Sequence, residues 1–128
     1  MVLSFRQWVF TAVALGLAGG AHAAPGDVVF AVHSPIPAQL TLLKEQGAVG
    51  RSNPFYKGYR PSFFFSGKSD VMCAIQLPDG QDKVDPGETV DVRLECIDSV
   101  VVKAEKPSFV FKEGGRTVGE GKLTLPTP

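Results

Sequence analysis

Apolar and polar residues alternate along several short stretches of this chain. The alternation is clearest over residues 89–97, where one set of alternate positions is apolar and the other is charged. The apolar set is Val90, Val92, Leu94 and Cys96, and the charged set is Asp91, Arg93 and Glu95. Because successive side chains of a strand point to opposite faces, this pattern predicts a half-buried antiparallel strand.

Shorter apolar runs, bounded by proline, glycine or polar turns, predict further strands. These runs cover residues 27–32, 38–43, 62–66, 71–77, 108–111 and 116–125, and residues 99–102 form one more short apolar segment. Pro35 and Pro37 are expected to end the first of them, because proline lacks the backbone donor of a ladder. No segment has a helical period of useful length. Six or seven short strands indicate an all-β sandwich or barrel, and a closed barrel leaves no unpaired edge.

Two of the expected strands carry residues that constrain how the sheet closes. Phe63 and Phe65 share one face of their strand, while Phe64 takes the other. Either that strand is covered on both sides, or Phe64 lies on an exposed apolar patch. Gly119 and Gly121 lie inside the last strand, where glycine suggests a bulge or a close approach of two backbones.

The first 23 residues have the order of a secretory signal peptide. One positive charge, Arg6, precedes an apolar run over residues 8–18, and Ala21-His22-Ala23 supplies small residues at a cleavage site. We expect cleavage after Ala23 and a periplasmic or secreted product. The run is shorter than the ~20 apolar residues that a spanning helix needs, so no membrane span is expected after cleavage.

The remaining chain is long enough for one small domain. We expect residues 24–35 to form an N-terminal segment with a candidate extra strand, residues 36–125 to form the barrel, and residues 126–128 to form a tail. Without residues 1–23, 12 Lys and Arg residues face 13 Asp and Glu residues, for a net charge of −1. This balance argues against broad electrostatic capture of nucleic acid, although residues 44–68 carry a local net charge of +4.

Several motifs of the barrel region occur in a characteristic order. They are Tyr56-Lys-Gly-Tyr-Arg-Pro61, Phe63-Phe-Phe65, Asp70-Val71, Ile75-Gln-Leu-Pro78, Pro86-Gly87 and Glu113-Gly-Gly-Arg-Thr-Val-Gly119 with Gly121. Together they resemble the C-terminal domain (domain 3) of bacterial elongation factor Tu over roughly residues 36–125. The resemblance implies a six-stranded antiparallel β-barrel, here as a free-standing exported domain.

The resemblance also implies a binding surface. In the full factor this domain packs on the GTPase domain and contacts the acceptor and T stems of aminoacyl-tRNA. Arg60 matches the arginine of the family's Gly-Tyr-Arg-Pro motif, and Glu113 with Gly114 matches its Glu-Gly pair near the tRNA stem. The surface that we expect to bind combines Lys57, Tyr59, Arg60, Lys68, Lys112, Glu113, Gly114 and Arg116.

Three departures from the family pattern bear on this expectation. The family has glutamine at Ser62, arginine at Lys112 and Thr-Gly at Met72-Cys73. In the full factor the position of Ser62 faces the GTPase domain, so its change fits a barrel that no longer docks there.

No catalytic constellation is apparent in the chain. Gly67-Lys68-Ser69 resembles the end of a phosphate-binding loop, but Ser62 stands where its first glycine belongs and no helix follows, so GTP binding is not expected. His33 is the one histidine after residue 23, and the carboxylates of residues 79–98 do not follow a calcium-loop pattern. We therefore expect a non-enzymatic binding module without a metal or other cofactor.

Cys73 and Cys96 can form one disulfide in an oxidising compartment or remain as two buried thiols. A simple hairpin that pairs Leu77 with Glu88 places Cys73 opposite Val92, four positions from Cys96. That spacing exceeds the Cα separation of about 7 Å that a disulfide tolerates. A bulge or another barrel register would bring the two cysteines together.

The expected partner is an unidentified protein. Aminoacyl-tRNA is the alternative, because the resemblance carries tRNA-contacting residues. A structural or adhesive role in the cell envelope is a further alternative.

Overall fold

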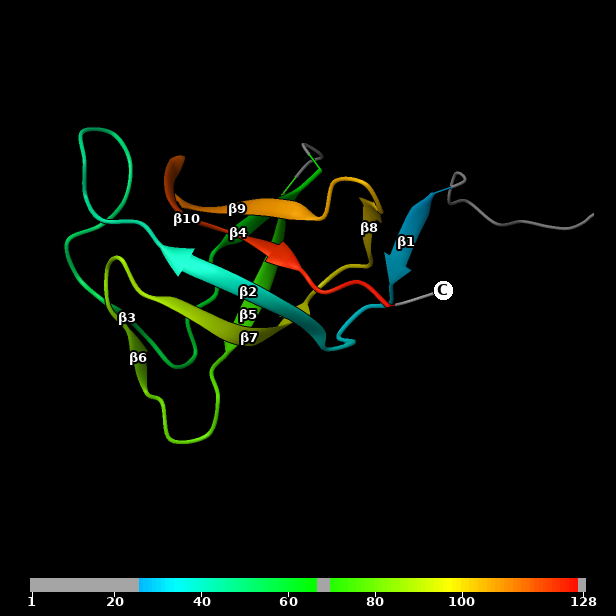
Figure 1. Cartoon of the computed structure of the whole chain (residues 1–128), viewed down its shortest axis with the longest axis horizontal. Helices are drawn as coiled ribbons and strands as arrows, with labels where there is room; N and C mark the ends of the chain where they lie inside the picture. The colour runs from blue at the N-terminus through cyan, green and yellow to red at the C-terminus, as the bar shows by residue number, and fades with distance from the viewer. Residues whose placement is uncertain (1–25, 67–69, 127–128) are drawn as a thin grey trace, which may run out of the picture.

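A computed structural model describes residues 26–66 and 70–126 of the chain, and this part consists of strands and connecting loops (Figure 1). The strands are β1 (Asp27–Phe30), β2 (Ile36–Leu42), β3 (Phe55–Tyr56), β4 (Ser62–Phe65), β5 (Val71–Gln76), β6 (Lys83–Val84), β7 (Thr89–Cys96), β8 (Val100–Lys103), β9 (Ser108–Glu113) and β10 (Arg116–Leu123).

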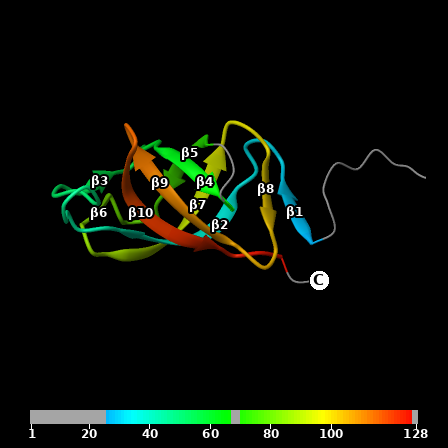
Figure 2. The same ribbon diagram turned by 90° about the horizontal axis from the view of Figure 1, so that it is seen from above.

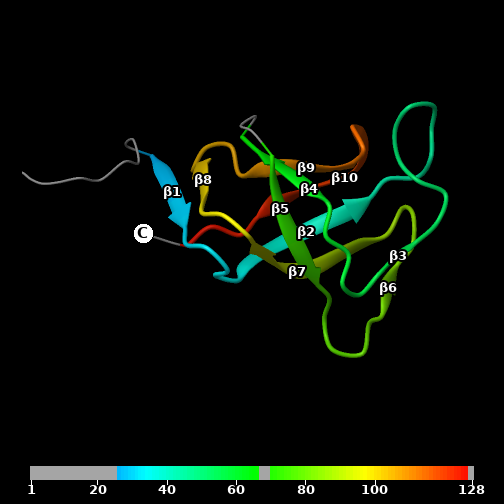
Figure 3. The ribbon, with the colours of Figure 1, turned by 180° about the vertical axis from the view of Figure 1, so that it is seen from behind.

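Six of these strands close into an antiparallel barrel in the order β10-β2-β7-β5-β4-β9, which confirms the predicted fold (Figures 1 and 3). The alternation in residues 89–97 gives β7 its orientation, since Val90, Val92, Leu94 and Cys96 are buried while Asp91 and Arg93 are exposed. The inward residues of β2 complete this wall of the core, and they are Ile36, Ala38, Leu40 and Leu42.

Pro37 lies inside a strand, contrary to the expectation that it would end one. It occupies the second position of β2, opposite Arg93 of β7. Its carbonyl accepts a hydrogen bond of 2.8 Å from the Thr124 N–H, so the missing N–H of Pro37 faces the side on which β10 has already ended at Leu123. The ladder to β7 therefore loses no donor there.

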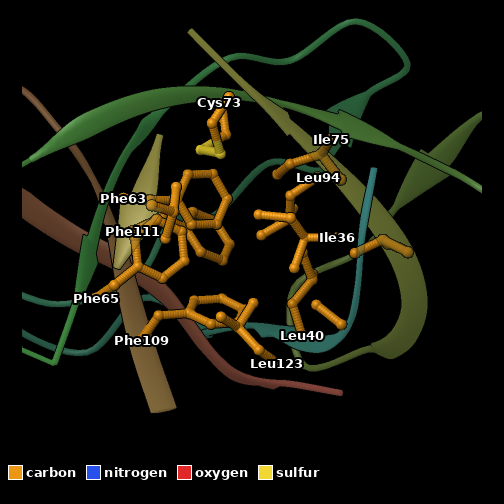
Figure 4. Packing of buried hydrophobic residues seen from close by; sticks show 14 of the residues in the cluster. Ile36, Leu40, Phe63, Phe65, Cys73, Ile75, Leu94, Phe109, Phe111 and Leu123 are labelled. Carbon is orange, nitrogen blue, oxygen red and sulfur yellow. A yellow bond between two sulfur atoms is a disulfide. The ribbon is translucent and has the colours of Figure 1, made fainter. Parts of the chain in front are cut away.

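Phenylalanine rings from β4 and β9 fill the other half of the barrel (Figure 4). The ring centroid of Phe63 lies 5.4 Å from that of Phe109 and 5.2 Å from that of Phe111, and Phe65 lies 5.8 Å from Phe109. Phe64 points to the outer face, where it is half-buried and the Lys112 ammonium lies 4.7 Å from its ring centroid. The outward ring is thus partly covered by a neighbouring lysine.

Two small two-stranded ribbons extend from opposite ends of the barrel (Figures 1 and 2). The β1–β8 ribbon covers one end, and Val28, Val100 and Val102 pack from it against the core. The β3–β6 ribbon lies at the other end and buries Phe55 and Val84. Each ribbon closes an opening through which water would otherwise reach the core.

A disulfide joins Cys73 of β5 to Cys96 of β7, with 3.9 Å between their Cα atoms. The two residues are direct cross-strand partners, and Ile75 pairs with Leu94. The hairpin register that places Cys73 opposite Val92 is therefore wrong. The reason lies in the connection, because residues 77–88 include β6 and its pairing with β3, which shifts the two strands relative to a simple hairpin.

Glycines of β10 make room for the closing strands. The register of β10 against β9 shifts between Thr117 and Gly119, as a bulge would produce. A Cβ at Gly119 would overlap the ring of Phe111, and a Cβ at Gly121 would overlap the Gln39 carbonyl. Side chains at these two positions are incompatible with the present closure.

The disulfide is expected to stabilise the fold by about 3 kcal/mol, the chain-entropy value for a closed loop of roughly this length. The Cys73→Ala, Cys96→Ala double variant should lose that much free energy of unfolding in urea titrations. Adding dithiothreitol should lower the stability of the parent and leave the variant unchanged. Equal urea midpoints for the oxidised parent and the variant would contradict this expectation.

Gly119→Ala is expected to destabilise the barrel by about 1–3 kcal/mol, because the methyl group must displace the buried Phe111 ring. Glu120→Ala is the matched control, since Glu120 is exposed on the same strand. Thermal unfolding followed by circular dichroism compares the two. Similar melting temperatures for both variants would show that Phe111 can move aside without cost.

Candidate functional site

Four of the residues predicted to bind lie at the end of the barrel formed by residues 44–51 and the β9–β10 turn, namely Tyr59, Glu113, Gly114 and Arg116. Arg51 organises this end. Its Nη1 donates to Glu113 Oε2 at 2.8 Å, its Nε to the Asn53 carbonyl at 2.9 Å, and its Nη2 to the Pro54 carbonyl at 3.0 Å. The rigid guanidinium fork thus ties a loop to the last residue of β9.

Arg116 holds the same loop from the other side. Its Nε donates to the Gly50 carbonyl at 2.6 Å, and its Nη2 donates to the carbonyls of Gly47 and Val49 at 3.0 Å each. The same Nη2 lies 3.8 Å from Glu45 Oε2. These contacts use the Nε and Nη2 groups of Arg116 within the chain, so its guanidinium holds the loop in place.

Tyr59 lies beneath Arg51 at the edge of the core. Its ring stacks on Phe55 with centroids 4.8 Å apart, and the Arg51 Cζ lies 5.3 Å from its centroid. Its buried Oη makes no hydrogen bond of standard geometry with any residue in the described ranges. Burial raises the pKa of the Tyr59 hydroxyl well above its ordinary value, and the nearby Glu113 carboxylate raises it further, while Arg51 acts in the opposite direction.

The other predicted residues protrude from this end. Lys57 is exposed and lies 3.8 Å from the exposed Asp82 carboxylate, a pair of the weak surface kind. Arg60 is exposed and forms no hydrogen bond or ion pair within residues 26–66 and 70–126. Lys112 lies over Phe64, and Gly114 forms the turn with a positive φ of 54°. Lys68 lies outside the described residues.

The structure brings four of the predicted residues to one end of the barrel, and their role in binding stays a prediction. Tyr59, Glu113 and Arg116 do meet, but they meet around Arg51, which was not among the predicted residues. Arg51 lies between two expected strands, where neither an alternating pattern nor a family motif distinguishes it. The sequence marks Arg51 only as a charged residue that directly follows Gly50. In the structure Gly50 has a φ of 84°, a conformation that only glycine adopts readily.

This end of the barrel is a charged surface. Besides the Arg51–Glu113 pair it carries the exposed Lys57 and Arg60, which flank Tyr59 in the sequence, and the half-buried Lys112, which precedes Glu113. Within the described ranges, no group of three or more His, Cys, Asp or Glu side chains is placed to hold a metal ion. In the same part of the chain, no helix is long and apolar enough to cross a membrane.

Comparison with known protein families matches residues 29–125 to the elongation factor Tu C-terminal domain. The match includes all six barrel strands and both arginines that hold the loop of residues 44–51. It starts within β1, the strand that precedes the barrel.

Tyr59→Phe is expected to change the free energy of unfolding at neutral pH by less than about 1 kcal/mol, because it removes a buried hydroxyl without a hydrogen bond. In alkali the two proteins should differ. The raised pKa keeps Tyr59 protonated in the folded state, whereas the unfolded tyrosine ionises around its ordinary value of 10.0, so the parent loses stability as pH rises above 10. Urea titrations between pH 8 and 11.5 should show a shallower loss for Tyr59→Phe, and parallel curves would contradict this assignment.

Proposed function

Because this chain belongs to the elongation factor Tu C-terminal domain family, we propose that it is an exported, non-enzymatic binding module whose Arg51–Glu113 end holds a partner protein. A translation-factor-like binding domain is what the family match itself supports. That the partner is a protein and that the chain is exported go beyond the family match, and both are part of our proposal.

The observation that supports this function best is an ordered surface, formed by Glu113 and residues 47–54, which the side chains of Arg51 and Arg116 hold in place. Arg51 and Arg116 together donate six hydrogen bonds to Glu113 and to backbone carbonyls of residues 47–54. A surface that is already ordered loses little conformational entropy when it binds. Lys57, Arg60 and Lys112 then supply the positive charge that steers and orients a partner with an acidic face.

Export is supported by two independent features. Residues 1–23 have the charge, apolar run and small-residue order of a signal peptide. The Cys73–Cys96 disulfide fits an oxidising compartment, such as the periplasm or the extracellular space. The sequence carries no phosphate-loop motif, and on this proposal the chain itself binds no GTP.

Binding of aminoacyl-tRNA is the second candidate, favoured by the family match and by the protruding cations. The charge of the chain argues against this second candidate. Glu113 lies at the centre of the cations, and the chain after residue 23 has a net charge of −1. A protein that neutralises few phosphates binds nucleic acid weakly at physiological salt. An envelope structural or adhesion role remains a further alternative, in which the partner is a cell-wall or host-surface molecule.

The test is site-specific crosslinking followed by charge reversal. A photoreactive residue at Arg60 should give a discrete protein adduct in living cells, whereas the same residue at Asp91, an exposed position in the middle of β7, should not. Combining Lys57→Glu, Arg60→Glu and Lys112→Glu should then weaken binding of the identified partner about tenfold or more. Adducts of equal intensity from both positions would contradict a specific surface.

The tRNA candidate has its own readout. A gel-shift titration with aminoacyl-tRNA should show no complex at low salt if the partner is a protein. A complex that weakens steeply with salt and is lost in Arg60→Ala would instead replace our proposal by the tRNA function.

A further inference from the structure

The β1–β8 ribbon lies at the opposite end of the barrel (Figure 2). Most of the large apolar side chains that are exposed in the described ranges lie at this end. Seven large apolar side chains are exposed in the described ranges, and five of them lie at this end: Val29, Val32, Met72, Ile97 and Val101. Backbone hydrogen bonds from the His33 N–H to the Cys96 carbonyl, and from the Ile97 N–H to the Met72 carbonyl, join the three segments that carry them. Such a gathering is uncommon on a surface without a binding role.

The register of the ribbon shows that β8 has an open edge. Ala104 N–H donates to the Gly26 carbonyl, whereas Lys103 N–H turns away from β1 and donates to Ser66 Oγ at 3.2 Å. Hydrogen-bonded and non-hydrogen-bonded pairs alternate in an antiparallel ribbon. Val101, two residues before Lys103 and opposite Val29, therefore also directs its N–H and carbonyl away from β1.

A hollow of about 440 Å³ lies beside this edge. The apolar residues Phe65, Val71 and Val101 line it together with the acidic residues Asp70 and Asp98. Lys103, also on the lining, is paired with Asp27 at 3.4 Å. Asp70 and Asp98 form no ion pair within residues 26–66 and 70–126, so the hollow combines backbone hydrogen-bonding groups, apolar surface and uncompensated negative charge.

We propose that this hollow docks an extended segment of a partner protein, in which apolar and cationic side chains alternate. The segment adds to the edge of β8 as a strand and exchanges hydrogen bonds with Val101. Its apolar side chains pack on Val101 and Val71, and its Lys or Arg side chains reach Asp70 and Asp98. This site is separate from the Arg51–Glu113 end and carries the opposite charge.

A second copy of this chain fits the hollow poorly. A symmetric pairing of two such ends would bring Asp70 and Asp98 of both copies together, and like charges at an interface oppose association. The strand that a second copy could offer, β1, contains an aspartate and no Lys or Arg. A basic strand from another protein satisfies both the charge and the backbone groups.

The test uses protein purified after expression of the full sequence and two fluorescein-labelled peptides. Lys-Val-Lys-Val-Lys-Val should bind in an anisotropy titration, and Glu-Val-Glu-Val-Glu-Val should not. Val101→Pro removes the N–H that faces the hollow and should abolish binding. Val29→Pro is its matched control, because the Val29 N–H lies on the far edge of β1, and it should bind like the parent.

Charge variants keep the proposal testable if Val101→Pro does not fold. Asp98→Lys should weaken binding about fivefold or more, and Asp79→Lys, an exposed acid outside the hollow, should not. Equal binding of both peptides, or equal losses for Asp98→Lys and Asp79→Lys, would overturn the proposal. So would sedimentation showing a dimer that Val101→Pro dissociates, because the occupant would then be a second copy.

Discussion

Barrel closure through β10 is the constraint on which the rest of the structure depends. This strand must pair with β9 on one side and β2 on the other, and both neighbours approach it closely. Gly119 lies against the Phe111 ring, and Gly121 lies against the Gln39 carbonyl and the Phe109 ring. Because neither glycine has a side chain, β10 can pair with both neighbours and close the barrel. The inward residues of all six strands then share a single core, and no barrel strand is left with an open edge.

A closed barrel of this size has no interior left for a ligand, since phenylalanine and aliphatic side chains fill it (Figure 4). Recognition is therefore confined to its surface and its ends, and the two ends are chemically different. One is a polar end at which two arginines hold a loop by its carbonyls. The other is an apolar ribbon with an open backbone edge and, within the described residues, two carboxylates without an ion pair. On the two proposals above, each end of the domain binds its own partner, and the two partners have opposite charge.

The disulfide fits the proposal that this domain is exported. In a multidomain factor, neighbouring domains bury part of each domain's surface and add to its stability. An isolated domain of about a hundred residues has only its own core, and small exported domains often add a disulfide. Cys73 and Cys96 join β5 to β7 inside the core, where the connection between the two strands is long and includes β6. The bridge therefore fixes the register of two strands that their own loop does not fix.

The amino-acid sequence by itself determined the all-β class, the six strands of the barrel and the residues that face its core. The physical reason is local: the two-residue period of Val90 to Cys96 or of Phe63 and Phe65 specifies which face is buried whatever the partner strand. Family motifs added the barrel's closure and the position of Glu113 and Arg116. Only the tertiary structure decided the pairing of Cys73 with Cys96, the place of Pro37 within β2, and the role of Arg51 as the centre of the candidate site. Each of these depends on what lies across a strand or a loop, and such contacts between distant residues leave no periodic trace in the sequence.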